Sequence, residues 1–223
     1  MSTAWALVPA KGPLLAKSRL RVVLEAEECA LLSAAMLRDV LHALEHATGV
    51  EQVAVLTDDD SVAAQVSAGG HTVIRDADDD LCASLDSAAT ELAGRGADTL
   101  LVLPGDIPTL TAADVDALLH RHESGLSLCP AIRDGGSNAV VCTPPDAIPF
   151  CFGEHSAARH LAEAQQRGLT AHRLALPAFF RDIDLPDDLV WLGAQAGGTH
   201  TQNFLRRSGL GARLGPSYLS ATG

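Results

Sequence analysis

The chain has 223 residues, 47% of them hydrophobic, and a formal net charge of −12. This length suits a single domain with a sizeable core, and the composition is that of a soluble α/β enzyme. The acidic balance argues against binding to nucleic acid polymers or to an anionic membrane, since both require a basic surface. No segment is long and apolar enough to span a bilayer, and no basic leader precedes the first strand-like segment, so we expect a cytoplasmic protein.

Strand-like and helix-like segments alternate along most of the chain. Apolar runs predict strands at residues 4–8, 52–57, 71–74, 100–103, 126–131 and 139–142. Stripes of apolar residues at helical spacing predict helices at residues 29–47, 62–67, 81–93, 112–122 and 157–167. Regular alternation of this kind predicts a mostly parallel sheet with helices on both faces.

The basic residues near the N-terminus form a local island in an otherwise acidic chain. Both lysines of the protein, Lys11 and Lys17, follow the first strand together with Arg19 and Arg21, and the first 21 residues contain no acid. A phosphate-rich substrate would need such an island for steering and charge neutralisation. The alternative is a solvated basic turn. The segment is not a Walker A motif, which would read GxxxxGK[ST].

Asp106 follows a buried apolar strand and a Pro-Gly break. In parallel α/β sheets, ligands bind at the edge where the strands end. Thr111 and Asp114 already have the spacing of a capping box for the next helix, so Asp106 is not required there. We interpret Asp106 as a candidate metal ligand; a turn aspartate satisfied by backbone N–H groups is the alternative.

Two glycine-containing segments are candidates for binding an anion. Gly135-Gly136 precedes Ser137, and this stretch is either a hairpin turn or a place where backbone N–H groups approach a ligand closely. Gly153 and Ser156 stand where the helix at residues 157–167 begins, and a helix N-terminus suits a phosphate or carboxylate. The alternative for Ser156 is a role as the N-cap alone.

Asp182 and Asp184 flank Ile183 in a segment that reads as extended, so their side chains are expected on one side of it. Together with Asp106 they would make an all-oxygen site for a hard cation such as Mg²⁺. Asp184 has a second explanation, which is to cap the helix that begins at Pro186. We expect residues 1–196 to form the folded domain and residues 197–223, rich in Gly, Ser and Arg, to be a poorly ordered or accessory tail.

A basic loop after the first strand and three carboxylates at strand ends suit nucleotidyl transfer. Cations would hold a triphosphate, and Mg²⁺ on the carboxylates would neutralise charge as pyrophosphate leaves. Two alternatives stay open. One is a nucleotidyl- or glycosyltransferase of the same fold with another acceptor, although such enzymes usually carry a glycine-rich loop after the first strand, which is absent here. The other is a catalytically inactive nucleotide-binding protein.

The ordered set of motifs resembles the guanylyltransferases of coenzyme F-420 biosynthesis. The resemblance runs from about residue 5 to 192 and rests on six segments: VPAK (8–11), AKSRL (16–20), LPGDIP (103–108), GSNA (136–139), FGEHSAARH (152–160) and DIDLPDDL (182–189). It implies a Rossmann-like, three-layer nucleotidyltransferase fold (GT-A-like) with a mostly parallel central sheet. Such enzymes join GMP from GTP to the phosphate of 3-phospho-D-glycerate, phosphoenolpyruvate or 2-phospho-L-lactate, and they release pyrophosphate.

The resemblance also implies roles for individual residues. Mg²⁺ would be held by Asp106, Asp182 and Asp184. The phospho-acid would be bound by Ser137, Gly153 and Ser156. On charge placement, the triphosphate would face Lys11, Lys17 and Arg19. We further expect the guanylylated product to pass to a transferase that uses it on the deazaflavin precursor.

Two positions depart from the family pattern. Ser137 stands where the family often has Thr, and Leu81-Cys82 stands where many members have Leu-Asn. Loss of an amide that hydrogen-bonds the substrate changes which acid is accepted, because unmatched polar groups discriminate strongly. Because Cys82 replaces this Asn, we rank 3-phospho-D-glycerate higher among the three candidate acids than we otherwise would.

Overall fold

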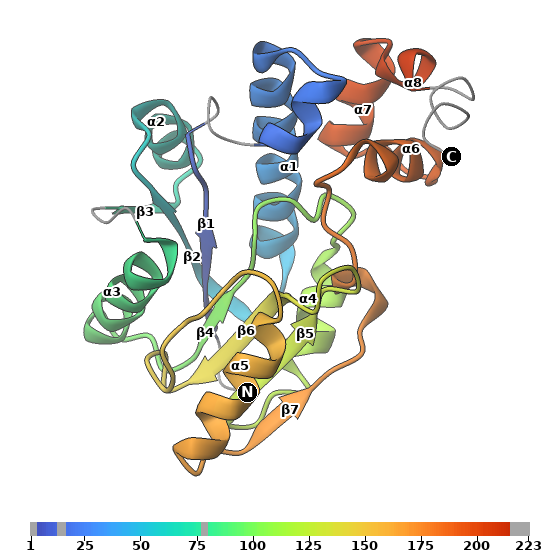
Figure 1. Ribbon diagram of the computed structural model, residues 1–223. Coiled ribbons are helices and arrows are strands. Elements are labelled where there is room, and N and C mark those ends of the chain that lie inside the picture. Colours follow the sequence, from blue (N-terminus) through green and yellow to red (C-terminus); the bar gives the residue numbers. More distant parts are fainter. Residues whose placement is uncertain (1–3, 13–16, 77–79, 215–223) are drawn as a thin grey trace.

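The computed structural model describes residues 4–12, 17–76 and 80–214. These residues form a seven-stranded sheet in the order β3-β2-β1-β4-β6-β5-β7 (Figure 1). The strands are β1 (Ala4–Pro9), β2 (Val50–Thr57), β3 (Thr72–Arg75), β4 (Leu100–Val102), β5 (Gly125–Pro130), β6 (Ser137–Thr143) and β7 (Ala171–Arg173). Only β6 of these runs against its neighbours β4 and β5, so the prediction of a mostly parallel sheet is confirmed.

Helices cover both faces of the sheet and give a three-layer architecture. The α-helices are α1 (Ala26–His46), α2 (Asp60–Ala68), α3 (Leu81–Gly94), α4 (Ala112–Leu119), α5 (Ser156–Gln166), α6 (Pro186–Ala194), α7 (His200–Arg207) and α8 (Leu210–Arg213), and the 3₁₀ helices are η1 (Ser18–Val22) and η2 (Pro177–Phe179). Helices α1 and α4 share one hydrophobic core with the sheet, and α3 and α5 share the core on the opposite face. No helix in the described ranges is long and apolar enough to cross a membrane.

The predicted elements agree with the structure apart from their ends. Helix α2 begins where Asp59 accepts hydrogen bonds from two backbone N–H groups. Helix α4 begins with the predicted capping box, in which Thr111 accepts from the Asp114 N–H and Asp114 accepts from the Thr111 N–H. The hairpin interpretation of the stretch that contains Gly135-Gly136 is confirmed, because β5 and β6 pair antiparallel on either side of these glycines. Strand β7 was not expected, since its three residues leave most of their side chains partly or fully exposed.

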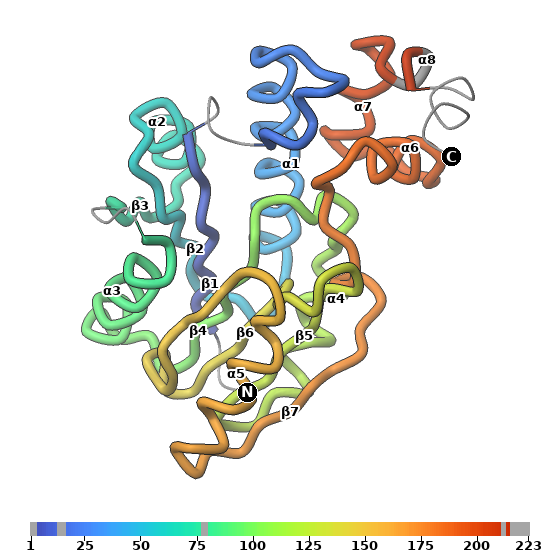
Figure 2. The backbone as a smooth tube through the Cα atoms, in the orientation of Figure 1, coloured from blue at the N-terminus to red at the C-terminus, as the bar shows by residue number. Residues whose placement is uncertain are grey.

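Residues 197–214, expected to be poorly ordered or an accessory arm, contain helices α7 and α8. Helices α7 and α8 pack beside the N-terminal half of α1 and beside α6, as both backbone views show (Figures 1 and 2). Leu205, Leu210 and Leu214 are buried in a third core that also contains Leu20 and Met36. The apolar side chains of this segment are thus removed from water by a partner helix more than 150 positions earlier in the chain. Residues 215–223 of the expected tail and residues 13–16 of the basic loop lie outside the described residues.

Candidate active site

Asp106 lies in the loop that follows β4, at the carboxyl edge of the sheet. The Lys17 ammonium group donates a 2.6 Å hydrogen bond to Asp106 Oδ2. Asp106 Oδ1 is buried and has no hydrogen-bond partner among the described residues. Asp106 is therefore not a turn aspartate satisfied by neighbouring N–H groups, because its partner is a cation 89 positions away in the chain.

Lys17 is held in an unusual backbone conformation. It precedes η1 with φ +56°, in the left-handed region that non-glycine residues rarely adopt. Such conformations persist where the surrounding structure imposes them, and they cluster at ligand sites. The side chain is 9% exposed, and its Nζ also lies 3.5 Å from Asp184 Oδ1. Burial alone would lower the pKa of Lys17, but the negative charges of Asp106, Asp184 and Asp182 raise it, so the ammonium form is held.

The segment containing Asp182 and Asp184 is pinned beside Asp106. The Ile183 N–H donates to the Asp106 carbonyl at 3.0 Å, and the Ile183 side chain is fully buried in the third core. The Arg19 guanidinium donates to Asp184 Oδ2 at 2.8 Å. Burial, and then the charge of Asp106, raise the pKa of Asp182. Two segments that are distant in sequence thus place their carboxylates at one edge.

Asp184 is not the cap of α6. The Asp188 carboxylate accepts the N–H groups of Asp184 and Leu185 at 3.0 and 2.8 Å, which satisfies the start of the helix. Asp188 is buried and also pairs with Arg133. Sequence analysis gave Arg133 and Asp188 no role; the only signal for Arg133 was its position just before the glycine turn. With Asp188 capping α6, the Asp184 carboxylate is directed instead to Lys17 and Arg19.

The side-chain chemistry of the three aspartates suits a hard cation. All their donor atoms are oxygens, the ligands that Mg²⁺ prefers. Oδ1 of Asp106 is a buried acceptor without a partner among the described residues, and the burial of Asp182 beside a second carboxylate favours a nearby positive charge. The three carboxylates do not form a set in which one oxygen from each lies within 4.8 Å of the other two. The Lys17 ammonium lies between Asp106 and Asp184.

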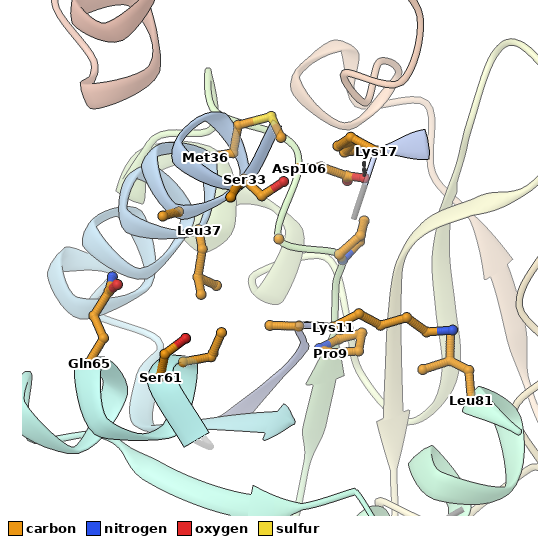
Figure 3. A pocket seen from close by; sticks show the side chains of 16 residues that line it. Pro9, Lys11, Lys17, Ser33, Met36, Leu37, Ser61, Gln65, Leu81 and Asp106 are labelled. Atoms are coloured by element: carbon orange, nitrogen blue, oxygen red, sulfur yellow. Dashed lines mark hydrogen bonds and ion pairs between the residues drawn. The ribbon is translucent and has the colours of Figure 1, made fainter. Parts of the chain in front are cut away.

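A cavity of about 350 Å³ opens beside Lys17 and Asp106, and it is bounded by the end of β1 and by helices α1 and α2. Figure 3 shows the side chains of Ser33, Ser61 and Gln65 around it. Lys11 lies on the lining as well, but its side chain extends toward Leu81 and not toward the carboxylates (Figure 3). The basic residues of the first loop therefore separate into two positions around one cavity.

The residues predicted to bind the phospho-acid form a second cluster, between β6 and the start of α5. Ser156 Oγ donates to Ser137 Oγ at 3.1 Å, and both side chains are buried. His155, with φ +57°, is the N-cap of α5, so Ser156 is the first helical residue and not the cap. Gly153 is exposed and adopts φ +113°, which favours glycine. His160, which the resemblance included without a role, is buried and bonded to Ser137.

The sheet edge, its carboxylates and the adjoining cavity form the candidate site, and comparison with known proteins specifies the family. A family model described as "Guanylyl transferase CofC like" matches residues 4–218. The chain belongs to this family. It is accordingly a guanylyltransferase, and the match extends over α7 and α8, so the family domain includes these helices.

Relatives agree with this assignment, and solved structures share the fold. The phosphoenolpyruvate guanylyltransferase of Roseiflexus castenholzii is 40% identical over 202 residues, 91% of this chain and 93% of that protein. The 3-phospho-D-glycerate guanylyltransferase of Phenylobacterium zucineum is 37% identical over 212 residues, 91% of this chain and 95% of that protein. A candidate nucleotide-diphospho-sugar transferase from Desulfovibrio desulfuricans has the same fold, with a TM-score of 0.78 at 19% identity and coverage of 96% and 97%. A nucleotidyl transferase from Methanothermobacter thermautotroptrophicus aligns with a TM-score of 0.61 at 18% identity, covering 93% of this chain and all of that one.

Proposed function

We propose that this guanylyltransferase joins GMP from GTP to the phosphate of a three-carbon phospho-acid and releases pyrophosphate. The observation that carries the proposal is the placement of Lys17, between Asp106 and Asp184 and beside a cavity at the carboxyl edge of the sheet. A buried ammonium beside carboxylates and open space suits a ligand that carries several phosphates together with a metal ion.

The nucleotide occupies the cavity beside Lys17, with its triphosphate toward the first loop. Lys17 and Arg19 supply positive charge at the carboxylates, and Lys11 supplies it from the opposite part of the lining. Ser33, Ser61 and Gln65 offer hydrogen-bonding groups to the nucleoside. The neutral part of GTP thus enters the largely apolar part of the cavity, while its phosphates stay near the cations.

Asp106, Asp182 and Asp184 are the residues that hold Mg²⁺. When bound there, the ion neutralises negative charge on the transferring phosphoryl group and on the departing pyrophosphate. With Mg²⁺ held there, the Lys17 ammonium would add positive charge for the phosphates at the same edge of the sheet.

The phospho-acid binds near Ser137, Gly153 and Ser156. Gly153, exposed just before α5, leaves room for an anion to approach closely, and the positive end of the helix dipole favours a negative charge there. The Cys82 thiol contacts the Phe152 carbonyl at 4.0 Å, so residue 82 borders this segment. Relatives named for phosphoenolpyruvate and for 3-phospho-D-glycerate both match this chain, and residue 82 is a candidate for choosing between such acids.

The reaction is an in-line substitution. An oxygen of the acid's phosphate attacks the α-phosphorus of GTP, the new P–O bond forms, and the bond to the pyrophosphate oxygen breaks. The attacking oxygen is already anionic, so the site does not require a general base. Catalysis then comes from holding the two anions together and from offsetting their repulsion.

Pyrophosphate release tests this proposal. Purified protein is incubated with GTP and Mg²⁺, and each of the three phospho-acids is offered separately. We expect release with one acid, loss of release when Mg²⁺ is chelated, and loss in Asp106→Asn. Asp98→Asn, which removes a charge from an exposed position, is the matched control. If folded protein releases no pyrophosphate with any of the three acids, the proposed acceptor is wrong.

The product joins GMP to the acid through a phosphoanhydride, and we propose that a second transferase consumes it on a deazaflavin precursor. This follows from the family's place in coenzyme F-420 biosynthesis. Isotope dilution checks the transfer: with both enzymes present, direct hand-off leaves the final product undiluted by added unlabelled intermediate. Full dilution would mean that the intermediate is released to solution.

A further inference from the structure

His160 has both ring nitrogens hydrogen-bonded in a buried position. The Cys151 N–H donates to His160 Nε2 at 3.0 Å, and His160 Nδ1 lies 3.0 Å from Ser137 Oγ. A backbone N–H can only donate, so Nε2 must carry the lone pair. In the neutral ring the proton is then on Nδ1, and Nδ1–H donates to Ser137 Oγ. The backbone of residue 151 thus fixes the tautomer of the histidine.

Ser137 Oγ receives a second hydrogen bond. Ser156 Oγ donates to it at 3.1 Å, and the side chains of Ser137, Ser156 and His160 are all buried. A hydroxyl oxygen has two lone pairs and one proton. With both lone pairs used by His160 and Ser156, the Ser137 proton is the remaining hydrogen-bonding group of this side chain.

We propose that His160 is a positioning residue that makes Ser137 a hydrogen-bond donor toward an anionic oxygen of the phospho-acid. This rests on the proposed function, which places the acid near Ser137. Ionised phosphate and carboxylate oxygens accept hydrogen bonds. A hydroxyl whose proton is not used inside the protein can donate to them, whereas a hydroxyl that donates to a histidine nitrogen cannot. A threonine hydroxyl at this position would offer the same proton and lone pairs.

The surroundings of His160 keep the ring neutral and in place. Burial, together with the nearby charge of Arg159, lowers the pKa of His160 to about 4. The rings of Phe150 and Phe152 meet it edge to face, with centroids at 6.3 and 5.2 Å. The donor from Nδ1 to Ser137 therefore persists across the neutral pH range, and the ring plane is held by packing.

Two variants separate positioning from a merely structural role. His160→Leu removes donor and acceptor, His160→Gln retains one of each, and the exposed His120→Leu is the control. We expect His160→Leu to raise the KM for the phospho-acid about tenfold, the effect of weakening one hydrogen bond to a charged group, with the KM for GTP unchanged. His160→Gln should recover much of that loss. An unchanged KM for the acid in folded His160→Leu overturns the proposal.

The tautomer is measurable without any variant or activity. Long-range ¹H–¹⁵N NMR of the wild-type protein should show His160 with its proton on Nδ1 at neutral pH, and adding the acid without GTP should shift that Nδ1 signal. An Nε2–H tautomer, or no shift on saturation with an acid that is turned over, overturns the proposal even if the enzyme is active. If wild-type protein turns over no acid, the proposed function fails, while an Nδ1–H tautomer still supports an outward-donating Ser137 that serves a different anion.

Discussion

Lys17 combines three properties that rarely occur together in one residue. It adopts a left-handed backbone conformation, its side chain is almost fully buried, and it pairs with carboxylates that are 89 and 167 positions later in the chain. Burying an ammonium group is costly unless it is paired. The pairing with Asp106 and Asp184 offsets that cost, and the same contacts hold the cation at the edge where the phosphates are proposed to bind.

Replacement of Lys17 tests its role directly. Lys17→Met keeps most of the side-chain volume but removes the charge, so we expect kcat/KM for GTP to fall about 100-fold, as when a group that stabilises transition-state charge is lost. Steady-state kinetics with saturating acid provides the measurement. Arg207→Met, which removes an exposed positive charge, should stay near wild type. Retention of near-normal kcat/KM in Lys17→Met would show that the charge is not used.

A carboxylate on α1 holds the N-terminus of α7, in addition to the packing of the two helices in the third core. Asp39, buried on α1, accepts hydrogen bonds from the His200 N–H at 2.7 Å, the Thr201 N–H at 2.9 Å and Thr201 Oγ1 at 2.6 Å. It therefore caps the N-terminus of a helix that is distant in sequence, where a negative charge is also favoured by the helix dipole. Leu205 of this helix lies in the same core as Leu20 of η1, the 3₁₀ helix that follows Lys17.

Loss of this cap should destabilise the protein. Asp39→Ala leaves backbone donors of α7 without their acceptor, so we expect the free energy of unfolding to fall by about 2–3 kcal/mol. Urea denaturation gives the value. Asp39→Asn, which retains an acceptor oxygen, should lose less, and Asp98→Ala at an exposed position should change stability little. A fall of less than about 0.5 kcal/mol in Asp39→Ala would mean that packing alone holds α7.

At the scale of the whole molecule, the buried histidine links stability to pH. The pKa of His160 is lowered to about 4 from an ordinary value of 6.5. Below the ordinary value the unfolded chain binds a proton that the folded protein excludes, so stability falls as the pH drops from there toward the folded pKa. The full stabilisation from the neutral His160 is present above the pKa of the unfolded chain. Relative to a pH below the folded pKa, it amounts to about 3 kcal/mol.

Comparing the pH dependence of the unfolding free energy in wild type and in His160→Gln isolates the contribution of this histidine. Between about pH 7 and about pH 5, His160 should remove about 2 kcal/mol from the free energy of unfolding of the wild type. His160→Gln lacks the titrating group, so its unfolding free energy should fall by about that much less over the same interval. Urea titrations of both proteins at each pH give the comparison. Parallel pH curves would contradict a neutral, buried His160.

Local patterns were sufficient for the layers and for several site residues. Helix α1 was predicted from the spacing of its apolar residues, because one face of a long amphipathic helix must be buried whatever the partner. Asp106 was singled out because a strand end and a capping box left it without a local task. Asp182 and Asp184 were singled out by alternation about Ile183, whose burial the structure confirms.

Only the tertiary structure decided which of these residues meet. Helix α7 is short and mostly polar and α8 has only four residues, so the sequence alone does not show that their leucines pack in a core with α1 and α6. The contact of Lys17 with Asp106 depends on a left-handed turn that no local preference predicts for lysine, and the role of His160 depends on the Cys151 N–H that fixes its tautomer. The sequence by itself determined most of the elements, because helical and strand periodicities and caps are local. The assembly of the site required long-range packing, since the partners of each charge come from segments far apart in the chain.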